Sequence, residues 1–250
     1  MNDLQGYFEN NTHNLIHKWT HYFDIYDRYF SQWRGTDVHI LEIGVSHGGS
    51  LQMWKDYFGP AARLFGVDIN PYCKNFEDEQ TTIFIGDQGD RSFLDRLVQQ
   101  LPRLDIVIDD GGHIMKQQIN TFEVLYPHLA PTGLYICEDL HTSYWSYFGG
   151  GYQRSSTFIE YSKNFIDYIH AWHSKNARKL DVSEFTRSTY ALHYYDSMLV
   201  IEKKPMIRPE HRMTGIPTLP SEPLPLQLNS LEKVIERVRR SISARLKNWC

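Results

Sequence analysis

Acidic side chains and histidines follow two short apolar stretches near the middle of the chain. The first group is Asp109, Asp110 and His113, after residues 106–108, and the second is Glu138, Asp139 and His141, after residues 134–137. Carboxylates that lie close together are costly unless a cation pairs with them, and their oxygens suit a hard divalent ion such as Mg²⁺. The alternative is that these acids only cap the following helices. A helix needs one cap, and two consecutive acids exceed that need, so the pattern indicates a metal site.

The two apolar stretches have the length of buried strands, and the chain between them has a helical pattern. Residues 116–129 carry apolar side chains at helical spacing, so we expect a strand–helix–strand unit. Strands joined in this way are parallel, and their carboxyl ends therefore meet at one edge of the sheet. Ligands of open α/β sheets bind outside that edge, which is where both acidic groups are expected.

A glycine-rich turn lies closer to the N-terminus. Residues 38–43 have the pattern of a strand, and Gly44 and Gly48 follow it before a helix expected over residues 51–58. Glycines at such a turn allow positive φ and a close approach of a ligand to the backbone. The spacing is not GxGxxG. The acid Glu42 at the strand end would repel a dinucleotide pyrophosphate, whereas it would not repel the cationic head of S-adenosylmethionine.

The next two expected strands also end in polar side chains. Residues 64–68 form a second strand, and its Asp68 is placed to bind ribose hydroxyls, as the acid after the second strand does in dinucleotide-binding folds. Residues 82–85 form a third strand, which is followed by Asp87 and Gln88. Their polar groups are in a position to meet an adenine edge, and a solvated turn is the alternative interpretation.

The alternation of strands and helices predicts an α/β protein with a Rossmann-like, doubly wound, mostly parallel sheet. A helix is expected over residues 155–172, and two strands over residues 190–195 and 198–203 close the fold. The connection between these two strands is tight, so the last strand is expected to be antiparallel. The α/β domain is expected over residues 36–204.

The segments outside this domain have different patterns. In residues 14–33, aromatic side chains recur in steps of three and four, which predicts an N-terminal helix within residues 1–35. We expect this helix to pack on the sheet or on a partner subunit, and a place beside the substrate is the alternative. Residues 205–227 form a proline-rich tail. Residues 228–250 predict a basic amphipathic helix that docks on its own chain or on a sister subunit of a homo-oligomer, with a membrane surface as the alternative.

Composition excludes several classes of protein. The 250 residues are 41% hydrophobic and 22% charged, as expected for one globular domain with appendages, and the formal charge of −4 argues against general nucleic-acid binding. The three cysteines form no spacing motif. The N-terminus lacks the pattern of a signal peptide, and no apolar run approaches the ~18 residues of a membrane span. We therefore expect a cytoplasmic protein without stable membrane insertion.

The motifs taken together resemble those of the metal-dependent class I S-adenosylmethionine O-methyltransferases of the mycinamicin and macrocin sugar type, close to the cephalosporin hydroxylase-like family. The shared motifs are the turn from Glu42 to Ser50, then Asp68, Gly86 with Asp87, Asp109 to His113, Glu138 to Tyr144, and Tyr194 to Ser197. The resemblance covers residues 36–204. It implies transfer of a methyl group from S-adenosylmethionine, with Mg²⁺ or another divalent cation, to a hydroxyl of a sugar or of a glycosylated polyketide product.

The resemblance also implies a role for individual residues. Asp110, Glu138 and Asp139 would hold the metal, and His113 would be the general base. The residues that would bind the cofactor are Glu42, Gly44, Ser46, Gly48, Ser50, Asp68, Asp87, Gln88 and Asp109. The residues that would bind the acceptor are His141, Tyr144 and Trp145. Tyr144 and Trp145 belong to an aromatic, glycine-containing stretch, residues 142–152, that suits a lid over a sugar-like ligand, and a loop folded onto the core is the alternative.

Two other classes of function remain open at this stage. The first is a metal-dependent hydrolase in which the same acids activate water, and it leaves Glu42 and Asp68 without a role. The second is a catalytically idle Rossmann-like domain that recruits a partner through its C-terminal helix, and it predicts neither metal binding nor turnover.

Overall fold

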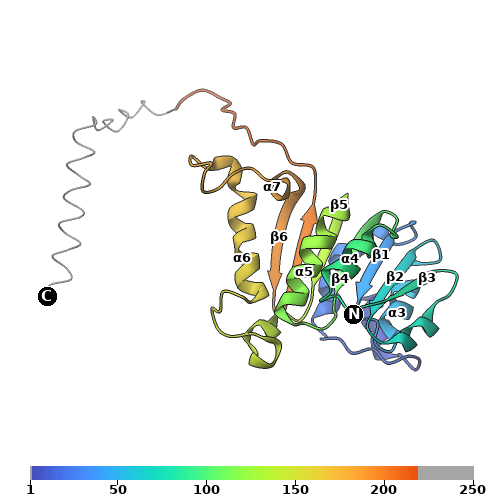
Figure 1. The fold of residues 1–250 in the computed structure, drawn as a ribbon. Helices are drawn as coiled ribbons and strands as arrows, with labels where there is room; N and C mark the ends of the chain where they lie inside the picture. Colours follow the sequence, from blue (N-terminus) through green and yellow to red (C-terminus); the bar gives the residue numbers. More distant parts are fainter. Residues whose placement is uncertain (1, 219–250) are drawn as a thin grey trace. The chain divides into compact units, whose positions relative to one another are not determined.

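A seven-stranded sheet forms the centre of the protein, for which a computed structural model describes residues 2–218 (Figure 1). The strands are β1 (His39–Ile43), β2 (Arg63–Asp68), β3 (Thr81–Ile85), β4 (Leu104–Asp109), β5 (Leu129–Cys137), β6 (Thr189–Tyr195) and β7 (Met198–Lys203). Their order across the sheet is β3-β2-β1-β4-β5-β7-β6. Strands β1 to β5 are parallel, and β7 lies antiparallel between β5 and β6. The predicted mostly parallel sheet with an antiparallel last strand is confirmed.

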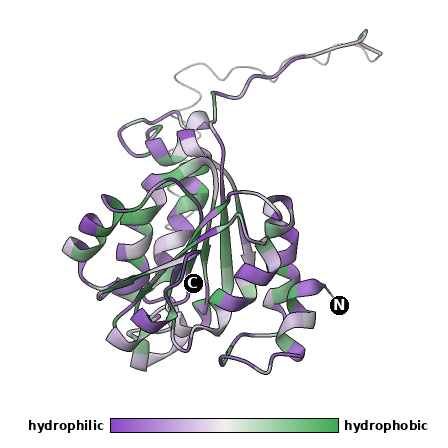
Figure 2. Ribbon diagram, turned by 90° about the vertical axis from the view of Figure 1, so that its right-hand side faces the viewer, coloured by the Kyte–Doolittle hydropathy of each residue, from purple (hydrophilic) through white to green (hydrophobic). Residues whose placement is uncertain are grey.

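The central strands β1, β4 and β5 have buried side chains on both faces, which alternate between two hydrophobic clusters. Ile40 of β1 belongs to the cluster that contains the buried side chains of α2 (Tyr22–Phe30) and α3 (Gly49–Phe58), whereas its neighbour Leu41 belongs to the cluster under α4 (Arg91–Val98), α5 (Met115–Leu125) and α6 (Phe158–Ile169). This alternation follows from the two-residue period of a strand. Figure 2 shows the strands in green between helices whose outward sides are purple.

Helices cover both faces of the sheet. The α-helices are α1 (Asp3–Glu9), α2 (Tyr22–Phe30), α3 (Gly49–Phe58), α4 (Arg91–Val98), α5 (Met115–Leu125), α6 (Phe158–Ile169) and α7 (Glu184–Ser188). Figure 1 shows α4, α5 and α6 side by side along one face. Local side chains fix the starts of several helices: the carboxylate of Asp90 accepts a hydrogen bond at the start of α4, and the hydroxyl of Thr157 does so at the start of α6.

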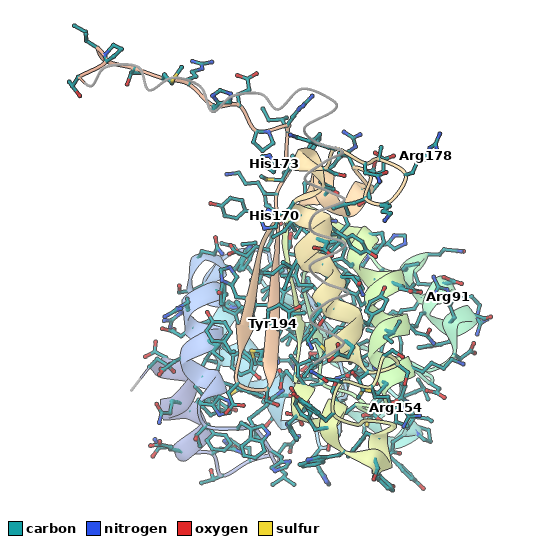
Figure 3. The ribbon with its side chains drawn as sticks, turned by 90° about the vertical axis from the view of Figure 1, so that its left-hand side faces the viewer. Arg91, Arg154, His170, His173, Arg178 and Tyr194 are labelled. Carbon is teal, nitrogen blue, oxygen red and sulfur yellow. The ribbon has the colours of Figure 1, made fainter. Side chains whose placement is uncertain are left out.

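Short 3-10 helices fill several of the connections. They are η1 (Ser31–Trp33), η2 (Pro71–Phe76), η3 (Tyr126–His128), η4 (Leu140–Tyr144), η5 (Ser146–Phe148) and η6 (Ala171–His173). Strand β6 ends the sheet on the side seen in Figure 3, where Tyr194 reaches from β6 to α6. Its hydroxyl donates a hydrogen bond to the carbonyl of Ser162 at 2.9 Å. One face of β6 therefore packs on α6.

The predicted helix over residues 14–33 is wrong in its first half. Residues 10–21, all described, contain no helix or strand, and only α2 and η1 are helical within the predicted range. The backbone of this segment lies directly on the start of α3, where a Cβ added to Gly49 would stand 2.4 Å from the carbonyl oxygen of Leu15. The aromatic spacing of α2 continues into this segment, but the segment contacts the start of α3 and does not continue the helix, and Trp19 is 52% exposed.

The proline-rich tail is described only as far as residue 218, and residues 210–218 contain no helix or strand. The basic helix predicted over residues 228–250 lies outside the described residues. No helix in the described part has the length and apolar character needed to cross a membrane. Cys73 and Cys137 are buried free thiols in the described part of the chain.

Candidate active site

A cavity of about 380 Å³ opens at the carboxyl ends of the parallel strands. It lies where the acids and the glycine turn were predicted to meet. Six of the nine predicted cofactor residues line it: Gly44, Ser46, Ser50, Asp68, Asp87 and Gln88. Glu42, Gly48 and Asp109 do not line the cavity. Each hydrogen-bonds to a residue that does: Glu42 to Ser50, Gly48 to Val45 and Asp109 to Gln88. The structure thus brings the predicted cofactor residues together in two layers, one at the cavity wall and one behind it.

Gly44 has a conformation and a position that exclude other residues. Its φ is +97°, and a Cβ at this position would stand 2.0 Å from the carbonyl oxygen of Asp110. Gly48 caps α3 with φ +75° and would meet the ring of Phe76 at 2.8 Å. Glycine is the residue that tolerates both a left-handed backbone and such an approach. The turn after β1 is therefore in direct contact with the residue that follows β4.

Asp68, at the end of β2, holds this turn in place. One of its carboxylate oxygens, Oδ2, accepts hydrogen bonds from the backbone N–H groups of Val45 at 3.0 Å and Ser46 at 2.8 Å. The other, Oδ1, accepts from the N–H of Asn70 at 2.8 Å. A carboxylate has about four lone-pair directions, so Asp68 retains acceptor capacity toward the cavity. It both supports the turn and presents an acceptor to a ligand.

Gln88 and Asp109 form a buried support beneath the next loop. The amide nitrogen of Gln88 donates to Asp109 Oδ1 at 2.9 Å, and its amide oxygen accepts from the N–H of Gly112 at 2.7 Å. Burial, together with the charge of Asp110, raises the pKa of Asp109 to about 7, although hydrogen bonds from Gln88 and Tyr135 oppose the shift. Asp109 therefore acts on the site through Gln88, behind the cavity wall.

Asp110, His113 and Asp139 form a compact group beside the cavity, and one ligating atom from each lies within 4.8 Å of the other two. The Nε2 atom of His113 is 3.5 Å from Asp139 Oδ2 and 3.8 Å from Asp110 Oδ1. His113 and Asp139 have left-handed backbones, with φ of 54° and 55°. Neighbouring residues of a regular strand point to opposite faces. The turn at Asp139 breaks that rule and directs its carboxylate toward the same region as Glu138.

Glu138, the third predicted metal ligand, is 1% exposed and fully engaged by two residues that the sequence did not identify. The hydroxyl of Tyr26 donates to Glu138 Oε1 at 2.5 Å. The ammonium of Lys18 lies 3.1 Å from Oε1 and 3.0 Å from Oε2. It also donates to Asp110 Oδ2 at 2.6 Å. Glu138 is therefore adjacent to the compact group, and Lys18 bridges it to Asp110.

Charges in this region depend strongly on one another. Burial raises the pKa of Glu138, the charge of Asp110 adds to the rise, and Lys18 opposes it. Burial lowers the pKa of Lys18, but the charges of Asp110, Glu138 and Glu42 outweigh that effect and leave its pKa well above the usual range. Lys18 is thus a buried cation among carboxylates. No short-range sequence pattern signals it, because its partners lie 92 and 120 residues away.

Aromatic side chains surround the outer side of the acids. The ring of His141 lies 4.5 Å from the ring of Trp145 and 5.6 Å from the ring of Trp19, edge to face in both cases. The Nδ1 atom of His141 lies 2.5 Å from the hydroxyl oxygen of Ser197. Trp19 also lines a smaller cavity of about 100 Å³, next to Lys18, Asp110, Glu138 and Asp139.

Of the predicted acceptor residues, Tyr144 and Trp145 are about half exposed. The Trp19 ring was assigned from sequence to the packing face of a helix, so its place beside His141 was missed. Gly149 adopts φ +81° at the end of η5, which turns the aromatic segment back toward the core. Phe148 of this segment lies 6.3 Å from the ring of His113. The predicted aromatic loop therefore stands beside the acids, with several of its rings exposed.

Known proteins with similar sequences are sugar O-methyltransferases. The chain is 38% identical over 189 residues to mycinamicin VI 2''-O-methyltransferase of Micromonospora griseorubida, an alignment that covers 71% of this chain and 47% of the relative. It is 35% identical over 188 residues to demethylmacrocin O-methyltransferase of Streptomyces fradiae, with the same two coverages. The chain spans about half the length of the curated relatives it matches. No protein-family model matches the chain.

A solved structure agrees with these relatives. The MycE methyltransferase of the mycinamycin biosynthetic pathway, in complex with Mg, SAH and mycinamycin VI, superposes with a TM-score of 0.71 at 32% identity. The match covers 93% of this chain and 58% of that chain. The fold is therefore that of the class I methyltransferases. The comparisons give no support to a hydrolase or to an idle partner-binding domain.

Proposed function

The chain is a homologue of the mycinamicin and macrocin sugar O-methyltransferases, and from this premise we propose that it methylates a hydroxyl of a sugar-bearing natural product. The methyl donor in this proposal is S-adenosylmethionine, and the metal is Mg²⁺ or another divalent cation. One observation carries the proposal: the cavity beside Asp68 and the group of Asp110, His113 and Asp139 share a wall, since Asp110, His113 and Asp139 line that cavity too.

The cavity fits an S-adenosyl compound in its chemistry. Gly44 lines this cavity, and Asp68, which lines it too, offers carboxylate acceptors of the kind that bind ribose hydroxyls. Asp87 and Gln88 line the same cavity and suit the adenine end. Glu42 is a buried carboxylate behind the wall, held by the hydroxyl of Ser50 at 2.8 Å. A carboxylate at this place does not repel a sulfonium cation, whereas it would repel the pyrophosphate of a dinucleotide.

The acids fit a hard divalent cation. Asp110 and Asp139 each place a carboxylate oxygen in the compact group, and both oxygens of Glu138 lie next to it on Lys18. Oxygen ligands with positions left for water or substrate are what Mg²⁺ prefers. When bound there, the metal would lower the pKa of an acceptor hydroxyl, as it does for bound water. Asp110, Glu138 and Asp139 are therefore the proposed ligands.

His113 is the proposed general base. Its Nε2 atom faces Asp110 and Asp139, and its Nδ1 atom is buried without a hydrogen-bond partner among the described residues. An imidazole in this position accepts the acceptor's hydroxyl proton at Nε2 as the methyl group is transferred, provided that the acceptor lies within hydrogen-bond reach. The ring of Phe148 lies beside it, with the ring centroids 6.3 Å apart. Holding the methyl carbon and the acceptor oxygen in line contributes much of the rate.

The acceptor is proposed to lie against the aromatic side chains. His141 and Trp145 present ring faces beside the acids, and Tyr144 is half exposed next to them. Aromatic faces suit the apolar side of a sugar ring, and a relative with this fold is solved with mycinamycin VI. We further propose a cytoplasmic location, with which the free thiols of Cys73 and Cys137 agree, and assembly as a homo-oligomer, which light scattering of the full chain would test.

Calorimetry with the purified chain tests the core of the proposal. S-adenosylmethionine and S-adenosylhomocysteine should both bind, and native mass spectrometry should detect an S-adenosyl compound retained from the cell. Mg²⁺ should then support methyl transfer to a glycosylated macrolide. Binding of NAD together with no binding of either S-adenosyl compound would overturn the assignment.

A further inference from the structure

The ammonium of Lys18 contacts carboxylate oxygens of Asp110 and Glu138, the residues that are proposed to bind the metal. Its ammonium nitrogen is within 3.1 Å of Asp110 Oδ2 and of both oxygens of Glu138, while its side chain is only 3% exposed. A hydrogen-bonded ammonium and a divalent cation both seek the lone pairs of these oxygens. Mg²⁺ binds at about 2.0–2.1 Å and demands near-octahedral geometry, so it requires these lone pairs in fixed directions. The two cations therefore compete for Asp110 and Glu138.

A second place for the ammonium exists close by. Glu42 is 1% exposed, and its Oε1 atom has no hydrogen-bond partner in the described part of the chain. This oxygen lies 3.7 Å from the nitrogen of Lys18. A buried carboxylate oxygen without a partner is costly, so an ammonium that approached it would gain a strong hydrogen bond. Glu42 is held in position on its other oxygen by Ser50.

The backbone around Lys18 allows such a movement without unfolding. The segment 10–21 has no helix or strand of its own, and Lys18 lines both described cavities. The chain on both sides of Lys18 stays fixed, because the backbone of Leu15 packs on Gly49 and the hydroxyl of Tyr22 donates to Asp139 Oδ1 at 2.9 Å. A side chain with four rotatable bonds needs only a change of rotamer to move between neighbouring carboxylates.

We propose that Lys18 is a built-in counter-ion that holds Asp110 and Glu138 together in the metal-free protein and moves to Glu42 when the divalent cation binds. The inference rests on the proposed function, because it takes Asp110 and Glu138 as metal ligands. Lys18 then has a positioning role. Its positive charge offsets the repulsion between the carboxylates of Asp110 and Glu138 and keeps them close together before the metal binds.

Crystal structures of the wild-type chain with and without Mg²⁺ test the exchange directly. With Mg²⁺, the nitrogen of Lys18 should lie within hydrogen-bond distance of Glu42 Oε1 and beyond that distance from both oxygens of Glu138. A nitrogen that stays on Asp110 and Glu138 in the Mg²⁺-bound crystal would overturn the inference. That result would leave the proposed function intact, since the metal would still be in place.

Lys18→Met tests the energetic consequence. We expect a clearly lower melting temperature than wild type in chelator, recovery of most of the difference at saturating Mg²⁺, and Mg²⁺ binding tighter by about tenfold or more in calorimetry. Lys18→Gln serves as the second variant if Lys18→Met does not fold. Lys163→Met is the matched control, because Lys163 pairs with Glu160 on the surface of α6, and neither measurement should change.

The remaining outcomes are also decisive. An equal loss of melting temperature with and without Mg²⁺, or weaker Mg²⁺ binding by Lys18→Met, would show that Lys18 remains with the carboxylates and would contradict the exchange. A wild-type chain that binds S-adenosylmethionine but no divalent cation would contradict both the exchange and the metal ligands. A chain that binds neither would contradict the proposed function itself.

Discussion

The Nε2 atom of His113 lies 3.5 Å from Oδ2 of Asp139, and both residues have a left-handed backbone. Each follows a different strand, β4 or β5, and each turns back over the edge of the sheet. Non-glycine residues rarely adopt this conformation, and those that do cluster at functional sites. The pair therefore relies on two unfavourable backbone turns.

His113→Ala and Asp110→Asn should fail in different ways. His113→Ala should leave Mg²⁺ and S-adenosylmethionine binding in place and lower kcat by about 10²–10⁴, the usual range for a positioned acid–base group. Part of the activity should return as pH rises, because solvent can then take the proton. Asp110→Asn should weaken Mg²⁺ binding and regain activity at high Mg²⁺. Calorimetry and pH–rate profiles of both variants check this, and a complete loss of metal by His113→Ala would make the histidine a ligand.

Asp68→Ala should weaken S-adenosylmethionine binding by about 1–3 kcal/mol through the lost acceptor. The same substitution removes the acceptor for the N–H groups of Val45 and Ser46, so the glycine turn should loosen as well. Asp68→Asn keeps one acceptor oxygen and should weaken binding less than the alanine variant does. Calorimetric titration of both variants provides the measurement. Equal affinity in wild type and Asp68→Ala would remove Asp68 from the cofactor site.

Trp145→Ala should raise KM for the acceptor or lower kcat, with little change in S-adenosylmethionine affinity. The reason is that Trp145 packs on His141 at the outer side of the acids and does not line the larger cavity. Tyr147→Ala is the matched control, because Tyr147 is in the same loop and 90% exposed. Steady-state kinetics with a glycosylated macrolide would distinguish the two variants. Identical kinetics for both would mean that the loop is packing only.

The raised pKa of Asp109 predicts that the free energy of unfolding depends on pH. Burial raises its pKa to about 7, whereas the unfolded chain has the ordinary value of about 3.9. The folded protein therefore binds the proton more tightly, and stability is lost as pH rises from about 4 through 7. The shift corresponds to at most about 4 kcal/mol. Asp109→Asn should remove this part of the dependence, and urea titrations of both proteins at pH 5 and pH 8 would measure it. An equal change in the free energy of unfolding of wild type and Asp109→Asn between pH 5 and pH 8 would contradict this prediction.

The sequence predicted those parts of the site that depend on local pattern. Asp68, Asp110 and Asp139 each follow a strand of regular apolar character, and the parallel connections bring such strand ends to one edge. Contacts between distant segments could not be predicted in this way. Lys18 and Tyr26 meet Glu138 across 120 and 112 residues, and nothing in their immediate neighbourhood marks them. A regular aromatic spacing in α2 also extended the predicted helix over residues held by those contacts.

The turn after β1 and the residue that follows β4 are so close at Gly44 that no methyl group fits between them, because a Cβ there would overlap the carbonyl oxygen of Asp110. Backbone contact, and not a replaceable side chain, thus fixes the turn after β1 against the residue that follows β4. In the proposed reaction the first segment borders the methyl donor and the second holds the metal, so substitutions of side chains around the cavity would leave this backbone spacing unchanged. New acceptors would have to be accommodated by the rings around His141, which makes that loop the place to begin in altering substrate range.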